Sequence, residues 1–167
     1  MKETNMQDWG LTERFSALAA TYPALSVGRV LSQQKGLYRV VCAQGEQSAA
    51  VSGRFRYGAA TVSDYPAVGD FVMLMPAESG DCAPIHAVLP RKSVFVRKSA
   101  GTSNSEQVVA ANVDVAFLCM ALNNDFNLRR LERYLSVAWD SGATPVVVLT
   151  KADLCADTES MRASAEA

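Results

Sequence analysis

The 167-residue sequence has no long hydrophobic run, and the longest, from Val115 to Leu122, has eight residues. A membrane-spanning helix needs about 20 apolar residues, so a helical membrane protein is excluded. The N-terminus also lacks the continuous apolar stretch of a signal peptide, because charged residues such as Lys2, Glu3 and Asp8 interrupt it. We therefore expect a cytoplasmic protein.

Metal-binding side chains are also scarce. The chain has one histidine, His86, and four cysteines with no C-x-x-C pair among them. This excludes a zinc module, and we expect no metal site within these residues. Cys42, Cys82 and Cys119 fall in apolar stretches, where a cysteine commonly acts as a small buried hydrophobe, so we predict reduced core residues rather than disulfides.

Charge is nearly balanced overall but unevenly distributed. Residues 26–98 hold nine basic and five acidic side chains, whereas residues 99–167 hold five basic and nine acidic ones. A change of sign near residue 98 predicts two domains with different partners.

The front of the chain predicts a helix followed by a barrel. Residues 1–25 form a helical segment, since Leu11, Phe15, Leu18 and Ala19 have helical spacing. Residues 26–90 change to short β-type runs, namely SVGRVLSQ, LYRVVCA, EQSAAVSGRF, DFVMLMP and CAPIHAVLP. Five short strands separated by turn residues favour a small antiparallel barrel, with an OB-fold as first choice and an SH3-like barrel as the alternative.

Basic and aromatic residues in this region suggest an RNA partner. OB barrels bind RNA through a positively charged groove with aromatic stacking, and Tyr38, Phe55 and Tyr57 lie close in sequence to arginines. The alternative is an ordinary solvated face, and the basic residues of 91–98 could equally brace a domain interface. The candidate RNA-binding residues are Arg29, Lys35, Arg39, Arg54, Arg56, Arg91 and Lys92.

Two further regions complete the chain. Residues 91–112 are interpreted as a connector, with a polar stretch from Ser99 to Ser105 typical of a loop or linker. Residues 113–167 begin with a buried strand to Leu122, continue with a helix over 127–141 and reach a second buried strand over 146–149. Asn127 and Gly142 are suitable caps for that helix. A strand, helix and strand form a βαβ unit, whose ligand sites lie at the carboxyl ends of its strands. The fold class is therefore a β barrel plus α/β.

Thr150-Lys151-Ala152-Asp153 follows the second strand and matches the [N/T]-K-x-D pattern by which many GTPases recognise guanine. An ionised Asp153 can accept two parallel hydrogen bonds from the guanine ring N–H and amino group. Adenine has an acceptor at the ring position and would lose that bond. The Lys151 stem can cover the purine face while Thr150 braces the loop.

A phosphate-binding loop, G-x-x-x-x-G-K-[ST], should precede this motif in a conventional GTPase, but the sequence contains no Gly-Lys pair. Either the motif is vestigial or the domain is circularly permuted, with the phosphate loop encoded beyond Ala167. A doubly wound domain for another ligand is a third possibility.

Three strings over residues 26–157 indicate the permuted alternative. They are Gln107 with AANVD at 110–114, RLERYL at 130–135, and TKADL at 150–154. Together with the barrel they resemble the ribosome small-subunit-dependent GTPase A (RsgA) family. The resemblance implies an N-terminal OB-fold, followed by the first βαβ part of a circularly permuted P-loop GTPase domain.

The resemblance also implies a function, which is GTP hydrolysis late in 30S subunit maturation, with the OB-fold contacting 16S rRNA. It further implies GTP or GDP as ligand, a monomer when full-length, and Mg²⁺ and structural Zn²⁺ bound by residues that this chain lacks. We therefore expect the chain to be the front part of a longer protein and to be inactive alone. The alternative is a non-catalytic OB-fold RNA-binding module with an incomplete nucleotide domain.

Overall fold

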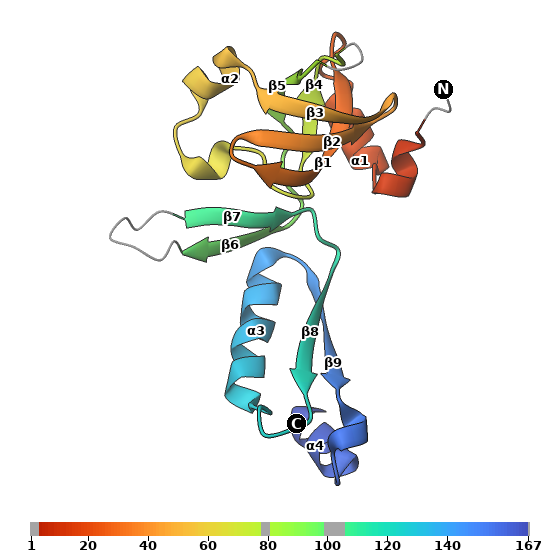
Figure 1. Ribbon diagram of the computed structural model, residues 1–167, viewed down its shortest axis with the longest axis vertical. Coiled ribbons are helices and arrows are strands. Elements are labelled where there is room, and N and C mark those ends of the chain that lie inside the picture. The colour runs from red at the N-terminus through yellow and green to blue at the C-terminus, as the bar shows by residue number, and fades with distance from the viewer. Residues whose placement is uncertain (1–3, 78–80, 99–105, 167) are drawn as a thin grey trace. The chain divides into compact units, whose positions relative to one another are not determined.

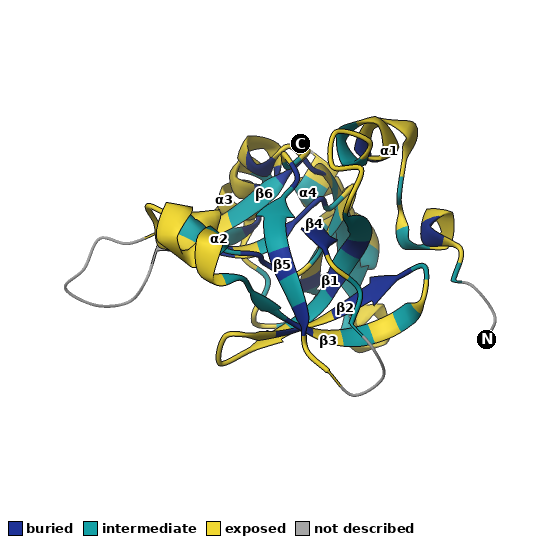
Figure 2. Ribbon diagram, turned by 90° about the horizontal axis from the view of Figure 1, so that it is seen from above, coloured by how far each residue is buried: buried dark blue, intermediate teal, exposed yellow. Residues whose placement is uncertain are grey.

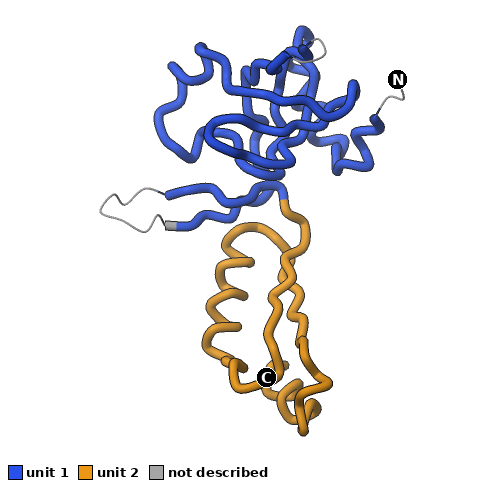
Figure 3. Tube along the Cα trace, viewed as in Figure 1, with its two compact units in different colours: residues 1–112 blue, residues 113–167 orange. Residues whose placement is uncertain are grey.

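A computed structural model describes residues 4–77, 81–98 and 106–166 (Figure 1). The chain divides into two compact units, Met1–Asn112 and Val113–Ala167, which Figure 3 colours separately. No helix in these ranges is long and apolar enough to cross a membrane.

The first unit contains a closed five-stranded barrel. Its strands are β1 (Ser26–Gln34), β2 (Leu37–Cys42), β3 (Gly45–Val51), β4 (Phe71–Leu74) and β5 (Ala83–Val88). They hydrogen-bond in the order β1-β2-β3-β5-β4, and only the β3–β5 pair is parallel. This is the OB-like barrel predicted from the sequence, so the first part of the fold-class prediction is confirmed.

Alternation along the strands fills the barrel interior. Inward-facing side chains of the five strands form one cluster, while the residues between them face outward. Figure 2 shows buried residues concentrated on β2 and β4 and an exposed helix α2. The buried members of the cluster are Val30, Tyr38, Val40, Ala49, Val72, Leu74, Ala83 and Ile85.

Helix α1 (Glu13–Ala19) covers the outside of the barrel and follows a short 3-10 helix, η1 (Met6–Trp9). The Phe15 ring lies 4.4 Å from the Phe71 ring, centroid to centroid, and both side chains are buried. A helix is present in the predicted segment of residues 1–25, but it covers only Glu13–Ala19. Phe15, with Leu18 and Ala19, packs it against the barrel.

The third predicted strand ran to Phe55, which is wrong. Strand β3 ends at Val51, and the Ser52 Oγ accepts a hydrogen bond from the Phe55 amide at 3.1 Å, which caps helix α2 (Gly53–Gly58). Serine is a favoured N-cap, so this contact starts a helix in a stretch whose alternation suggested a strand. A 3-10 turn, η2 (Val62–Asp64), then leads toward β4.

The region interpreted as a connector is an antiparallel hairpin of β6 (Val94–Lys98) and β7 (Glu106–Ala111). The polar stretch from Ser99 to Ser105 lies outside the described residues. The linker interpretation missed the strands because their pairing is anchored by the barrel. Val68 forms a β-bridge with Ala110, and its carbonyl accepts from the Ala111 amide at 2.9 Å.

Asn112 completes this junction. Its side-chain amide donates to the Gly69 carbonyl at 3.1 Å, and its side-chain oxygen accepts from the Lys92 amide at 2.8 Å. Asn112 is buried and adopts φ +56°, a left-handed conformation that asparagine tolerates better than most residues. Asn112 therefore orders the backbone between β7 and the segments that hold Gly69 and Lys92.

We expect substitution of Gly69 at this junction to destabilise the fold. It has φ +90°, and a Cβ there would lie 2.1 Å from the Ala111 carbonyl oxygen. Gly69→Ala therefore combines backbone strain with displacement of β7, and we expect it to lower the free energy of unfolding by about 2–3 kcal/mol. Urea denaturation measures this, with Gly36→Ala as the matched control. Gly36 has φ +82° but nothing within 4 Å of the added Cβ, so it reports strain alone, about 1 kcal/mol. Equal losses in the two variants would contradict the packing argument.

The second unit is the predicted βαβ unit. Strands β8 (Val115–Ala121) and β9 (Thr144–Thr150) are parallel and are connected by helix α3 (Leu128–Ser141). Both predicted caps are present, since the Asn127 side chain accepts from the Arg130 amide and Gly142 is left-handed. Strand β9 is longer than predicted because it includes Pro145, which is tolerated near a strand's start. Two short elements follow, η3 (Ala152–Leu154) and α4 (Thr158–Glu166).

Strand β8 was predicted to be buried, but one of its faces is not covered by any described residue. Phe117 is 69% exposed and Cys119 is also exposed, whereas Met120 on the other face is buried. The prediction of three buried cysteines is therefore wrong for Cys119, and also for Cys82, which is exposed before the start of β5. Cys42 is buried as predicted, and none of the four cysteines forms a disulfide.

Candidate functional site

The tetrapeptide Thr150 to Asp153 lies where β9 ends. Thr150 is the last residue of the strand, and its carbonyl accepts from the Leu122 amide at 2.8 Å. Its hydroxyl donates to the Met120 carbonyl at 3.4 Å, so Thr150 contacts the end of β8 and the residue that follows it. Thr150 therefore braces the start of the loop against the neighbouring strand.

Lys151 turns the chain sharply after the strand. It has φ +57° and ψ +35°, a left-handed conformation that costs a non-glycine residue about 1–2 kcal/mol. The η3 turn begins at the next residue, and the Lys151 carbonyl accepts from the Leu154 amide at 3.1 Å. Backbone strain of this kind often occurs at functional sites. It places Lys151 and Asp153 on an exposed loop at the carboxyl end of the parallel pair.

Asp153 is exposed, and its carboxylate has no hydrogen bond or ion pair to any residue in the described part of the chain. Both of its oxygens are therefore available to a ligand. A free carboxylate on a braced loop fits the edge of a guanine ring, which presents two parallel N–H donors.

An ion pair between Asp125 and Arg130 lies close to this loop. Asp125, in the segment between β8 and α3, accepts two hydrogen bonds from the Arg130 guanidinium, each at 3.0 Å. Arg130 also lies 3.3 Å from the Met120 sulfur, which ties the pair to the end of β8. Arg130 and, to a smaller extent, the positive charge of Lys151 lower the pKa of the Asp125 carboxyl.

We expect the Asp125 carboxyl to titrate below the usual range of an aspartate. A carboxyl with a lowered folded-state pKa stabilises the fold above its unfolded pKa, and that contribution is lost as the pH falls through the folded value. NMR titration of Asp125 measures the midpoint. Arg130→Gln is expected to raise it toward the ordinary value of an aspartate, because the side-chain hydrogen bonds and positive charge of Arg130 are lost. Arg129→Gln, on the neighbouring exposed position of α3, is the control and should leave the midpoint unchanged. If the Asp125 midpoint is the same in Arg130→Gln as in the unmodified chain, the pairing of Asp125 with Arg130 would be contradicted.

Asp125 is a site residue that the sequence analysis missed, and Arg130 was noted only as part of the RLERYL string. Their position follows from topology, because the carboxyl ends of parallel strands meet at one edge of the sheet. The residues after β8 therefore lie next to the residues after β9. Recognising that the segment after Leu122 shares an edge with Thr150 would have identified Asp125 as a neighbour of Lys151.

The sequence around the loop lacks the residues that bind phosphates in GTPases. Phosphate loops use a glycine-rich backbone and a lysine, and no Gly-Lys pair occurs in the 167 residues. Within the ranges that the structure describes, no group of three or more His, Cys, Asp or Glu side chains could hold a metal ion.

The candidate RNA-binding residues occupy different environments on the barrel unit. Lys35, Arg54 and Arg56 are exposed, and Arg39 is exposed and paired with Glu46. Lys92 is exposed, and its backbone amide contacts Asn112. The side chains of Arg29 and Arg91 are instead used within the fold.

Arg29 donates to the Trp9 and Asn112 carbonyls, and its guanidinium lies 5.2 Å from the Phe71 ring centroid. Arg91 donates to the carboxylate of Asp70, whose side chain is fully buried, with a closest approach of 2.7 Å. Tyr38, suggested as a stacking residue, is 2% exposed inside the barrel, so that suggestion is wrong. Burial also raises the pKa of the Tyr38 hydroxyl.

A closed OB-like barrel followed by a parallel βαβ unit that ends in [N/T]-K-x-D, with no phosphate loop before it, is the arrangement of a circularly permuted GTPase. Residues 88–167 match the model of the RsgA GTPase family. The chain belongs to this family, and its sequence corresponds to the N-terminal part of the family's members.

Curated relatives agree over most of the chain. It is 45% identical over 153 residues to the small ribosomal subunit biogenesis GTPase RsgA 2 of Lactiplantibacillus plantarum, covering 92% of this chain and 43% of the relative. It is 38% identical over 173 residues to the RsgA of Syntrophotalea carbinolica, covering 97% and 46%. The chain therefore spans less than half the length of these relatives.

Solved structures show the same fold. YjeQ from Thermotoga maritima superposes with a TM-score of 0.64 at 25% identity, covering 85% of this chain and 46% of that one. YloQ, described as a circularly permuted GTPase, superposes with a TM-score of 0.62 at 23% identity, covering 85% and 47%. The barrel followed by α/β elements is thus a known arrangement.

Proposed function

We propose that this chain is the base-selecting and RNA-contacting part of a factor that binds and hydrolyses GTP during late assembly of the small ribosomal subunit. The observation that carries the proposal is the position of Thr150 to Asp153, on a braced loop at the carboxyl end of β9 with the Asp153 carboxylate unpaired among the described residues. Family membership supports the ribosomal setting.

In this proposal each residue of the loop has one role. Asp153 accepts two hydrogen bonds from guanine, Lys151 covers the purine face with its aliphatic stem, and Thr150 holds the loop to β8. Bound GTP would supply the bond between its β- and γ-phosphates that is hydrolysed. In this proposal, the residues that would hold the phosphates and Mg²⁺ lie outside these 167 residues. The residues of a structural Zn²⁺ site would also lie outside them.

The partners of the proposed factor are the 30S subunit and its 16S rRNA, which the barrel contacts. The exposed basic residues Lys35, Arg39, Arg54, Arg56 and Lys92 are the proposed contacts, and Arg29 and Arg91 contribute mainly to the fold. We propose a cytoplasmic protein that is monomeric at full length.

The turnover of GTP tests this proposal. The full-length gene product is expected to hydrolyse GTP with Mg²⁺, and to do so faster with 30S subunits, whereas the 167-residue chain alone is expected to show no turnover because it has no phosphate loop. Release of inorganic phosphate measures both. Clear Mg²⁺-dependent turnover by the isolated chain would contradict the division of roles.

A second function is favoured by one observation, the lack of any Gly-Lys pair in the chain. It is a non-catalytic RNA-binding module with an incomplete nucleotide domain. The two functions separate on the coding sequence that follows Ala167, because only the GTPase requires a G-x-x-x-x-G-K-[ST] loop there.

A further inference from the structure

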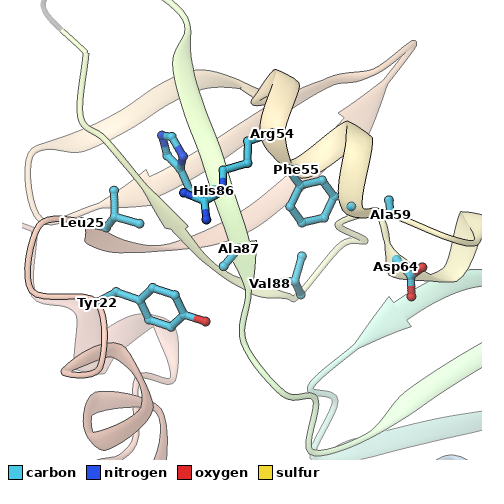
Figure 4. Close-up of a pocket in the computed structure, with 10 residues that line it drawn as sticks. Tyr22, Leu25, Arg54, Phe55, Ala59, Asp64, His86, Ala87 and Val88 are labelled. Atoms are coloured by element: carbon cyan, nitrogen blue, oxygen red, sulfur yellow. The ribbon is translucent and has the colours of Figure 1, made fainter.

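The outer surface of the barrel contains a cavity of about 610 Å³ that the sequence analysis did not anticipate. Tyr22 and Leu25, in the segment between α1 and β1, form one wall, and Arg54 and Phe55 of α2 form the other. The floor is the second half of β5, from His86 to Val88 (Figure 4). The cavity lies wholly within the barrel unit.

Two local irregularities create this shape. The register of the β4–β5 pair passes from Met73↔Ala87 to Leu74↔Ile85, so His86 is an extra residue at a β-bulge. Bulges re-aim side chains and are common beside binding sites. The second irregularity is the Ser52 cap on α2. Because of this cap, the residues after Val51 form a helix instead of extending β3.

The rings lining the cavity suit a flat ligand. Phe55 is half-buried, and its ring packs edge-on against Tyr65 with centroids 5.8 Å apart, which fixes its orientation. Tyr22 is 38% exposed on the opposite wall, and the small side chain of Ala87 lies on the floor between them. A cavity of several hundred Å³ with aromatic walls accommodates a ligand of nucleotide size.

Charge is separated along the cavity. Arg54 and His86 lie at one end in Figure 4, and Asp64 lies at the other, beyond Phe55. The Asp64 carboxylate accepts hydrogen bonds from the Thr61 and Ala60 amides at 2.7 and 2.9 Å. These hydrogen bonds lower the pKa of Asp64, and the bond from Thr61 has the larger effect. One end therefore favours a phosphate, and the other offers an acceptor to the amino group of a base.

We propose that this cavity binds one unpaired nucleotide of RNA, with its base against the rings of Tyr22 and Phe55 and its phosphate near Arg54. The proposal rests on the proposed role of the barrel in RNA binding and adds a specific subsite to it. Stacking on aromatic rings tolerates many bases, whereas a duplex hides the faces of its bases. The site should therefore bind single-stranded RNA and reject a duplex of the same sequence.

Fluorescence anisotropy with a labelled 12-nucleotide single-stranded RNA of mixed sequence, and with its duplex, tests the proposal on the 167-residue chain. Tyr22→Ala and Phe55→Ala are each expected to raise the Kd for the single strand by about five- to tenfold or more, in the range of one lost base stack. Tyr22→Phe keeps the ring and should stay within about twofold of the unmodified chain. The matched control is Tyr134→Ala, since Tyr134 is 46% exposed on α3 and does not line the cavity, so it should leave the Kd unchanged.

A Kd unchanged by Tyr22→Ala would overturn the subsite, as would an unmodified chain that binds no single-stranded RNA. Phe55→Ala could weaken binding simply by misfolding, so photocrosslinking of the unmodified chain to the same RNA carrying 4-thiouridine provides a second test. Crosslinks in the peptides that contain Tyr22, Phe55 or His86 would support the site. Competition by nucleoside monophosphates below 1 mM would indicate a free-nucleotide site and overturn the RNA assignment. Co-sedimentation with 30S subunits tests the proposed function separately: if the chain fails to sediment with them but Tyr22→Ala still weakens oligonucleotide binding, only the ribosomal assignment fails.

Discussion

Asp153→Asn is expected to weaken GDP binding to the full-length gene product by about a hundredfold or more. The carboxylate is proposed to accept two hydrogen bonds from guanine, and hydrogen bonds to charged groups contribute about 1.5–3 kcal/mol each. Asparagine keeps one acceptor but places an amino group opposite a guanine donor, so one bond is lost and two donors face each other. Isothermal titration calorimetry with GDP measures the change.

A gain of function accompanies this loss. Xanthine has a carbonyl oxygen where guanine has its exocyclic amino group, so the asparagine amide can donate to it. We therefore expect Asp153→Asn to bind xanthosine diphosphate more tightly than GDP, reversing the preference of the unmodified protein. A variant that merely unfolds loses both ligands, so the reversal separates base recognition from stability.

Asp157→Asn is the matched control for this experiment. Asp157 is exposed four residues further along, and its carboxylate accepts from the Ser160 amide at 3.0 Å at the start of α4. Asparagine caps a helix about as well as aspartate, so the substitution should leave GDP affinity within about twofold. If instead Asp153→Asn binds GDP as tightly as the unmodified protein, Asp153 does not recognise the base, and the alternative of a doubly wound domain for another ligand is favoured.

The local patterns of the sequence were sufficient for the main elements. The strands of the barrel were identifiable because each is a short β-type run bounded by turn residues, and α3 because Asn127 and Gly142 mark its ends. The position of Thr150 at a strand end was also predictable, since an apolar run directly precedes it. Its recognition of guanine stays a prediction.

Features that depend on contacts between distant residues were not predictable in the same way. Strands β6 and β7 are held by Val68 and Gly69, which lie about 40 residues before their partners Ala110 and Asn112. Because these partners are distant in the sequence, the local pattern predicted a connector instead of two strands. Asp125 required the strand order, and the cavity beside α2 required a bulge at His86. Arg91 was assigned by composition, although its partner Asp70 is buried and 21 residues away.

Arg91→Met is expected to cause the largest loss of stability of any substitution considered for this chain. Arg91 donates to both oxygens of Asp70, at 2.9 and 2.7 Å, and to the Ser63 and Tyr65 carbonyls at 2.8 and 2.9 Å. The Asp70 side chain is 0% exposed, and its carboxylate also accepts a hydrogen bond from the Ala67 amide at 2.8 Å. Removing one partner of a buried ion pair leaves an uncompensated charge, which costs about 3–5 kcal/mol.

Hydrogen–deuterium exchange of peptides from β1 and β2 under increasing urea reports this loss in the barrel itself. Arg39→Met is the matched control, because Arg39 and Glu46 form an ion pair with side chains 67% and 45% exposed, and such pairs contribute about 0–1 kcal/mol. The double variant Arg91→Met with Asp70→Asn should be more stable than Arg91→Met alone, since no charge then remains buried. Arg91→Met that unfolds at the same urea concentration as the unmodified chain, yet binds single-stranded RNA more weakly, would show instead that Arg91 belongs to the RNA-binding surface.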